Sequence, residues 1–476
     1  MEQTKTAKFM DVLTTSEVER IIDTAHLVLA KIGVKVQHPE ALEMLRRKGA
    51  EVDGELVKVK PELIREAVAM APRGFVLYNR DGEPACDMTS PRLFFGTSTA
   101  SPRTRDAFSG EYRPTVIDDI VKGALVADAL PGINWVMPFG SAQDVPMEWA
   151  EIYEFEAVVN NTKKPIVFCG YSSKGVRRIY EMAAAVAGGM DILKEKPFVV
   201  VYPEPITPLT YPYEVVERMM ISADLVQPQL TCGCQQPGAT APITYAGLLV
   251  QGLAESLFSI ALAQFRQPGT PVFMAMNLGG FNMNTGIMSI SPPEASLGLS
   301  AQGQIARHYG LPSWGLAGAS DSKALDAQAG AESGMSLLAQ AQAGLTFIHD
   351  VGYLDMGMAC SLDMLILGDE LIGWVRRCLA PIEVNDDTLA FDEITAAGPG
   401  GNYLKSRKTL KLFRQTYWMP DMLERSAYST WMEKGSITLD RKVNDKVKKI
   451  LSGHKPPALP ESTQKTLKDI IKSTEA

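Results

Sequence analysis

Short apolar runs alternate with helix-length amphipathic segments through the middle of this 476-residue chain. Eight such runs are rich in β-branched or aromatic residues and end in polar or glycine-containing residues. Continuously apolar strands separated by amphipathic helices indicate a parallel sheet covered by helices, and eight of them predict a closed (β/α)8 TIM barrel. The runs are Arg92–Ser98, Ile133–Gly140, Pro165–Tyr171, Phe198–Glu204, Pro228–Gln235, Pro271–Leu278, Pro312–Ser320 and Gly344–Asp350.

The chain is longer than the ~250 residues that such a barrel requires. We therefore expect an α/β protein in three parts: a helical N-terminal extension over residues 1–91, a barrel domain over 92–380, and a C-terminal extension over 381–476 packed on the barrel. The last polar segment follows a proline-rich hinge at 455–460. The pattern leaves open whether this tail is a docked helix or a mobile end.

The N-terminal extension carries three helix signals. Ser16–Lys31 is amphipathic, with Thr15 and Ser16 as candidate capping hydroxyls. Pro39–Lys48 and Pro61–Met70 each begin with a proline, which suits the first turn of a helix. These segments predict helices joined by turns.

The net charge of −8, from 47 basic and 55 acidic residues, disfavours nucleic acid or an anionic membrane as the main partner. No apolar run reaches the ~20 residues of a membrane span, and the N-terminus lacks an apolar signal core. We therefore expect a cytoplasmic protein. Six cysteines in a chain of this length do not resemble a disulfide framework.

Cys232 and Cys234 lie two residues apart on the fifth predicted strand, so both thiols can face the same side. A zinc pair completed by a third ligand is one interpretation. Packing of two small side chains is the other, and it is favoured because zinc needs three or four ligands and the chain has only five histidines.

The C-terminal strand ends are where barrel enzymes place their chemistry. His349 ends the eighth run, and we expect it to act on or orient a ligand rather than bind metal. Asp321 lies in a dense polar stretch after the seventh run, and Glu332 follows on the next predicted helix. This stretch is either a ligand-holding loop or a solvated loop with a helix cap.

Other candidates at the strand ends are neutral or aromatic, and they include few obvious acid–base pairs. Aromatic faces with one or two carboxylates are how proteins bind quaternary ammonium cations. We expect His349 and Asp321, the two candidate catalytic residues, to share one cavity with most of them, with the Asp321 carboxylate beside the cation. The predicted substrate-binding residues are Phe95, Thr97, Gln236, Asn277, Phe281, Glu332 and Tyr353.

Four motifs together resemble the trimethylamine methyltransferase family, whose barrel subunits pass a methyl group from a methylamine to a cobalamin-carrying protein. The resemblance covers most of residues 15–435. It implies a one-carbon transferase from a family linked to methanogenesis. The motifs are Gly238–Thr244, Ser291–Ala295, Asp321–Lys323 with Asp326 and Gln328–Gly330, and Gly398–Gly401.

Members that act on trimethylamine are known for a pyrrolysine within the barrel, and this chain has only ordinary residues there. It therefore looks like the pyrrolysine-free branch. That branch includes methyltransferases for glycine betaine, proline betaine and carnitine-related compounds. Asn402 stands where the family often has histidine, a departure from the family pattern in that loop.

The resemblance implies methyl transfer from a quaternary amine, such as glycine betaine, to the Co(I) corrinoid of a partner protein, with release of the tertiary amine. A quaternary ammonium leaves as a neutral amine, so neither a proton nor a metal is needed to release it. We expect no metal on this chain and a homo-oligomer. The alternatives are a zinc-dependent barrel methyltransferase and a non-catalytic betaine-binding subunit.

Overall fold

A closed ring of parallel strands forms the centre of the computed structural model, which describes residues 9–98 and 100–475. Each predicted run supplies one strand, and β18 pairs with β6 to close the ring, so the predicted (β/α)8 barrel is confirmed. Single bridges at Gln229, Val272 and Ser313 complete the ring where strands are short. The strands are β6 (Phe94–Thr97), β9 (Ile133–Trp135), β10 (Ile166–Phe168), β11 (Val199–Val201), β13 (Cys234–Gln235), β14 (Asn277–Leu278), β17 (Trp314–Leu316) and β18 (Phe347–Val351).

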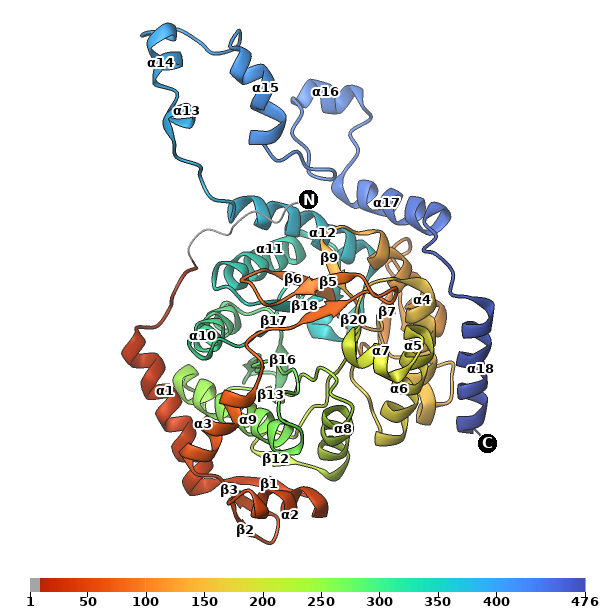
Figure 1. The fold of residues 1–476 in the computed structure, drawn as a ribbon. Coiled ribbons are helices and arrows are strands. Elements are labelled where there is room, and N and C mark those ends of the chain that lie inside the picture. The colour runs from red at the N-terminus through yellow and green to blue at the C-terminus, as the bar shows by residue number, and fades with distance from the viewer. Residues whose placement is uncertain (1–8, 99, 476) are drawn as a thin grey trace.

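Helices follow the strands and form the outer layer of the barrel (Figure 1). Their apolar faces pack on the outer faces of the strands in two large clusters, one that includes Phe95, Ile348 and Ile372 and one that joins Met276 and Leu278 to the helices over 213–309. The helices are α4 (Ile117–Ala129), α5 (Ala150–Asn161), α6 (Ser173–Ala187), α7 (Met190–Glu195), α8 (Tyr213–Asp224), α9 (Tyr245–Arg266), α10 (Pro293–Tyr309), α11 (Ala327–Gln342) and α12 (Leu362–Cys378).

A β-hairpin of the N-terminal extension, β4 (Val76–Tyr78) with β5 (Pro84–Asp87), seals the N-terminal end of the barrel. Phe75 and Leu77 of this segment join the interior cluster that also contains Phe273 and Phe347, which lie near the starts of the sixth and eighth strand runs. The rings of Phe75 and Phe273 meet edge to face with centroids 5.2 Å apart. This end of the barrel is therefore a continuous apolar core.

The three predicted N-terminal helices are present as α1 (Thr15–Leu27), α2 (Pro39–Arg47) and α3 (Pro61–Met70). Thr14, not Thr15 or Ser16, caps α1, because its hydroxyl oxygen accepts from the Glu17 N–H at 3.3 Å; the Thr14 N–H donates in return to the Glu17 carboxylate at 2.8 Å, which completes a capping box. The expectation of helices and turns alone was wrong. A small sheet also forms here, from β1 (Val34–Val36), β2 (Glu51–Asp53), β3 (Leu56–Lys58) and β12 (Thr210–Tyr211).

A four-stranded sheet and a hairpin add to the C-terminal end of the barrel. A small sheet joins the loops after the first and eighth strands, and a hairpin follows the sixth strand. The sheet contains β7 (Arg103–Arg105), β8 (Tyr112–Pro114), β19 (Tyr353–Leu354) and β20 (Ala359–Cys360), and the hairpin contains β15 (Gly280–Asn282) and β16 (Ile287–Ser289).

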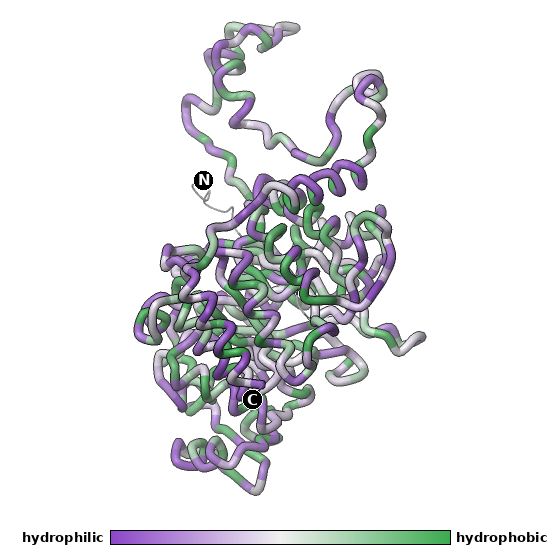
Figure 2. Tube along the Cα trace, turned by 90° about the vertical axis from the view of Figure 1, so that its right-hand side faces the viewer, coloured by the Kyte–Doolittle hydropathy of each residue, from purple (hydrophilic) through white to green (hydrophobic). Residues whose placement is uncertain are grey.

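The C-terminal extension is helical, and its last helix is docked rather than free. Leu467 and Ile471 of α18 are buried against α5 and α6. Short helices earlier in the extension project away from the barrel (Figure 1), and Figure 2 shows that they mix hydrophobic and hydrophilic residues. All helices of the extension, in chain order, are α13 (Asp386–Leu389), α14 (Phe391–Ala397), α15 (Arg407–Thr416), α16 (Tyr428–Glu433), α17 (Leu439–Gly453) and α18 (Glu461–Glu475).

Helix α9 is long and apolar enough to cross a membrane by length and composition, but 78% of its most apolar stretch is buried inside the protein. It packs against α1, α3 and α8. Burial of this kind is typical of the core helix of a soluble protein.

Candidate active site

Four interior side chains form a connected floor near the C-terminal end of the barrel. The indole N–H of Trp314 donates to Asn277 Oδ1 at 3.0 Å, and the Asn277 amide donates to the Tyr202 hydroxyl oxygen. The rings of Trp314 and His349 are 4.0 Å apart between centroids, and those of Tyr202 and Trp314 are 5.4 Å apart. Side chains from strands four, six, seven and eight therefore meet in one aromatic and polar layer.

His349 is a neutral imidazole. Its Nδ1 lies 2.9 Å from the carbonyl oxygen of Gly315, which can only accept, so Nδ1 carries the proton. Burial lowers the pKa of His349 to about 3. Its Nε2 is then an acceptor, 3.1 Å from Asp350 Oδ1.

Asp350 is the neighbour of His349 Nε2. Burial, and then the nearby charge of Glu204, raise the pKa of Asp350 well above its usual value. The contact with His349 is therefore between a neutral carboxylic acid and a neutral imidazole, not an ion pair. The second oxygen, Asp350 Oδ2, is buried without a hydrogen-bond partner in the part of the chain that the structure describes.

The backbone explains why two consecutive side chains share one site. Neighbouring residues of a strand normally face opposite sides. The register between β18 and β6 shifts between Ile348 and Val351, and Asp350 has a φ of +86°. A bulge with a non-glycine residue in the left-handed region costs on the order of 1–3 kcal/mol and is common at functional sites, where it re-aims a side chain.

Above this floor, at the ends of strands three, four and five, Glu204 and Tyr171 are accessible to solvent, with 45% of Tyr171 exposed, and Cys234 is half-buried. Yet the surrounding protein raises the pKa of all three side chains, that of Cys234 to about 12. These side chains therefore lie at the boundary between the protein interior and solvent. Glu204 also accepts a hydrogen bond from the Tyr202 hydroxyl at 2.6 Å.

Glu204 and Asp350 correct the sequence-based view that the mouth has few acid–base groups. Each residue ends a predicted strand run, so a search for charged residues at run ends would have found both. The buried Arg218 was also missed, because it lies on α8 and reaches the site only through the fold. Its guanidinium donates to the Gly170 carbonyl oxygen, and its positive charge lowers the pKa of Glu204 against the effect of burial.

Of the residues predicted from the sequence, His349 and Asn277 lie in this layer, and Gln236 hydrogen-bonds the Cys234 thiol. Phe95 does not line the mouth. It is buried on the outer face of the strands, with the Arg376 guanidinium 5.5 Å from its ring centroid. Thr97 is also fully buried, where its hydroxyl bonds both the N–H and the carbonyl oxygen of Met137 on the adjacent strand.

Asp321 and Glu332 hold loops together. Asp321 accepts from the Ser289 hydroxyl and, at 2.9 Å, from the Ile290 N–H. Glu332 accepts from the Ser320 hydroxyl at 2.6 Å and the Asp321 N–H at 2.8 Å. The two carboxylates therefore anchor the hairpin after strand six to the loop after strand seven.

Phe281 and Tyr353 lie on structures that cover this end of the barrel. Phe281 is half-buried on β15 of the hairpin. Tyr353 is buried on β19, and its carbonyl oxygen accepts from the Ser320 N–H at 3.1 Å. Both residues are near the mouth, on its loops rather than its floor.

The zinc alternative gains no support from the geometry. Cys232 contacts the Tyr202 hydroxyl at 3.7 Å, and Cys234 contacts Met288 at 3.7 Å. Within residues 9–98 and 100–475, no three His, Cys, Asp or Glu side chains are grouped closely enough to hold a metal ion.

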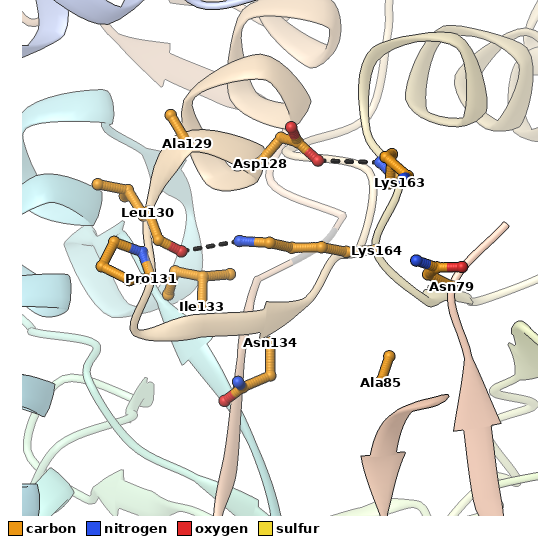
Figure 3. A pocket seen from close by; sticks show the side chains of 10 residues that line it. All are labelled: Asn79, Ala85, Asp128, Ala129, Leu130, Pro131, Ile133, Asn134, Lys163 and Lys164. Atoms are coloured by element: carbon orange, nitrogen blue, oxygen red, sulfur yellow. Dashed lines mark hydrogen bonds between the residues drawn. The ribbon is translucent and has the colours of Figure 1, made fainter. Parts of the chain in front are cut away.

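A recess of about 380 Å³ lies near the N-terminal end of the barrel, opposite the mouth (Figure 3). Lys164 crosses it and donates to the carbonyl oxygens of Ala127 and Leu130 at 2.6 and 2.7 Å, at the C-terminus of α4. Burial lowers the pKa of Lys164 to about 8. A cation at a helix C-terminus stabilises the helix. The site is far from the strand ends that carry barrel chemistry, so we assign Lys164 a structural role.

Comparison with known proteins agrees with this architecture. The family model for trimethylamine methyltransferase (MTTB) matches residues 2–476. The chain belongs to this family. It is 32% identical to the glycine betaine methyltransferase of Desulfitobacterium hafniense strain Y51, with 94% of each chain covered.

Two further relatives extend the comparison. The chain is 29% identical to the trimethylamine methyltransferase MttB of Desulfitobacterium hafniense strain DSM 10664 / DCB-2, covering 94% of this chain and 90% of that one. The crystal structure of the Methanosarcina barkeri monomethylamine methyltransferase (MtmB) shares the fold, with a TM-score of 0.53 at 11% identity over 97% and 89% of the two chains. The resemblance seen in the sequence motifs is confirmed, and the protein is a methyltransferase.

Proposed function

We propose that this methyltransferase demethylates a quaternary amine of the betaine class and delivers the methyl group to a reduced corrinoid on a partner protein. The observation that carries the proposal is the pair of carboxyl groups, Glu204 and Asp350, above an aromatic floor that contains Tyr202 and Trp314. The relative with 32% identity is a glycine betaine methyltransferase. We place the reaction in the cytoplasm.

The residues suit a cation that has no proton to give. A quaternary ammonium offers no hydrogen-bond donor, so it is bound by charge and by aromatic faces, each worth roughly 0.5–2 kcal/mol. Glu204 is the charge partner, because it is the carboxyl group that solvent reaches. In the empty site, the raised pKa of Glu204 favours its protonated form. A bound cation stabilises the ionised form, so binding of the cation releases that proton.

Asp350 and His349 shape the floor under the cation. The neutral pair fixes the imidazole, and the unpartnered Asp350 Oδ2 is a polar atom without a protein ligand. When bound, the reduced corrinoid supplies the nucleophile. The chain's own residues bind the amine, orient one N–CH3 bond towards the opening and exclude water.

The rim of the barrel supports a protein partner. Seven of the eight loops that follow the strands expose a large apolar side chain at this end of the barrel. Exposed apolar side chains offer contact area to a protein partner. These side chains are Phe108 (49% exposed), Met147 (89%), Tyr171 (45%), Ile206 (60%), Ile243 (64%), Met283 (64%) and Met358 (47%).

The experiment is to incubate the purified protein with Co(I)-cobalamin and single amines, following the loss of Co(I) absorbance. Glycine betaine, proline betaine, carnitine, γ-butyrobetaine and trimethylamine form the panel. We expect transfer from at least one quaternary amine. Transfer from trimethylamine alone would contradict the substrate class. Absence of transfer from any of them, with the native corrinoid protein also present, would contradict the reaction.

A further inference from the structure

A projecting segment of the C-terminal extension, residues 381–417, is called the arm below. It leaves the barrel at the end of α12 and returns to the same place, where the Arg377 guanidinium donates to the Thr416 carbonyl oxygen at 2.9 Å. Its helices α13, α14 and α15 contain no buried residue (Figure 1). The arm is therefore an ordered excursion without a core of its own.

The arm exposes large apolar side chains in stripes. On α15, Leu410 and Phe413 are three residues apart and are 65% and 40% exposed, and Tyr417 at the C-cap is 65% exposed. On α14, Phe391 and Ile394 are 74% and 54% exposed. Residues spaced three or four apart lie on one face of a helix. Helices α14 and α15 thus each present a largely exposed apolar face.

The exposed area is large enough for an interface. Aromatic side chains bury roughly 150–250 Å² each. Phe391, Phe413, Tyr403 and Tyr417 are all at least 40% exposed, so together with the aliphatic residues around them they offer a large part of the ~800 Å² per partner of a standard interface. Covering this surface would offset the entropy lost in ordering the arm.

The charges of the arm identify what covers it. Residues 381–398 contain five acidic and no basic side chains, and residues 399–417 contain five basic and no acidic ones. Within one chain, Lys408 already joins the two halves through Asp387 at 2.9 Å. Other charges of both halves, including Asp392 and Lys411, have no ion-pair partner in the described chain.

A sequence of this kind is complementary to itself. In a two-fold symmetric contact, the same patch of both subunits meets, so residue i contacts residue j and j contacts i. Two arms related in this way place the acidic half of each against the basic half of the other. A partner of one charge sign would be repelled by one of the halves.

The position of the arm leaves the active-site rim free. Helix α12 runs back from the mouth, and Arg376 near its end donates to Asn134 Oδ1 at 3.0 Å, at the start of β9. The arm therefore begins at the end of the barrel opposite the mouth. We propose that the arm is a dimerisation element that packs against the arm of a second copy of this chain, with acidic halves facing basic halves.

Charge reversal tests this arrangement on the full-length protein. One variant carries Arg407→Glu, Lys411→Glu and Arg414→Glu, so its arm has eight acidic and two basic residues. The other carries Glu383→Lys, Asp386→Lys and Asp392→Lys, so its arm has eight basic and two acidic residues. Sedimentation equilibrium across the micromolar range reports mass. We expect the wild type at twice the chain mass of 51.8 kDa, each variant alone at the chain mass, and an equimolar mixture at the dimer mass again.

A matched control reverses three exposed basic residues of the N-terminal extension, Arg20, Arg46 and Arg47, and should leave the dimer intact. Rescue by mixing distinguishes lost association from misfolding, because misfolded chains would not recover a defined dimer. A monomeric wild type would overturn the proposal. So would variants that stay dimeric alone, a mixture that stays monomeric, or a control that dissociates like the arm variants.

Discussion

The two ends of the barrel are built from the same eight strands and have opposite chemistry. At the N-terminal end, Phe273 and Phe347 pack with the β4–β5 hairpin into a sealed apolar core. At the C-terminal end, Glu204, His349 and Asp350 are brought together in protein surroundings that raise or lower their pKa values. Burying apolar groups stabilises the fold, whereas burying ionisable groups opposes it. The difference implies that stability resides at one end and function at the other.

The strongest test of this division is Phe347→Ala. Phe347 is fully buried and stacks on Trp135 with centroids 4.2 Å apart. Loss of the ring should lower the free energy of unfolding by about 3–5 kcal/mol. Chemical denaturation measures the loss, and activity per folded molecule should change little. A variant with wild-type stability would show that the apolar end does not carry the stability of the barrel.

Asp350→Asn is expected to stabilise the folded protein, in contrast to Phe347→Ala. The raised pKa of Asp350 means that the folded protein holds a proton the unfolded chain releases above about pH 4. The group thus contributes stability below that pH, and the contribution is lost as pH rises, at up to about 1.4 kcal/mol per unit. Asparagine is neutral, like the protonated Asp350, and tolerates positive φ.

Asp350→Asn should therefore raise the melting temperature, and by more at pH 8 than at pH 5. Thermal unfolding across this range measures the gain. The conservative change Asp321→Asn serves as its control, because it replaces a carboxylate that anchors a loop through Ser289 and Ile290 instead of the buried carboxyl beside His349. An equal gain at both pH values would mean that Asp350 is ionised in the folded protein.

Glu204→Gln tests the charge partner of the cation. A lost contact between a charged group and its ligand costs about 1.5–3 kcal/mol, which is roughly 10-fold to 150-fold in KM. Because the pKa of Glu204 is raised in the empty site, wild-type binding should strengthen as pH rises through that pKa. The variant should lose this dependence. A pH profile of KM that is unchanged by the substitution would remove Glu204 from the binding site.

His349→Ala should keep the fold and lose methyl transfer by about 10-fold or more, the scale of one lost positioning contact. Since His349 is neutral down to a pKa of about 3, its protonation should not produce an acid limb near pH 6.5 in the wild-type rate. Steady-state rates of the variant and the pH profile of the wild type check both statements. Wild-type activity in the variant would exclude His349 from the mechanism.

The smallest effect is expected for Asp321→Asn. Asp321 accepts hydrogen bonds from Ser289 and Ile290, which an amide oxygen can partly replace. We expect a change in KM of less than about threefold, since one hydrogen bond of about 1 kcal/mol is only weakened. Glu332→Gln, which alters the same loop anchor, should behave alike. A much larger rise in KM for Asp321→Asn than for Glu332→Gln would mean that Asp321 contacts the cation directly.

The sequence by itself determined the barrel, because each strand run is locally apolar and each helix locally amphipathic. It also placed His349 and Asn277 at strand ends, and its motifs indicated the family. It did not distinguish Phe95 from an inward-facing residue, because which face of a strand is interior depends on the closed ring.

Only the tertiary structure decided the chemistry of the mouth. Asp350 joins His349 because a bulge in β18 re-aims its side chain, and a bulge depends on pairing with β6, more than 250 residues earlier in the chain. The pKa of Glu204 depends on burial, Tyr202 and Arg218, and that of Asp350 on burial and the charge of Glu204, which are properties of distance in space. Local patterns specify periodicity along the chain, whereas the electrostatics of a site arise from groups that only folding brings together.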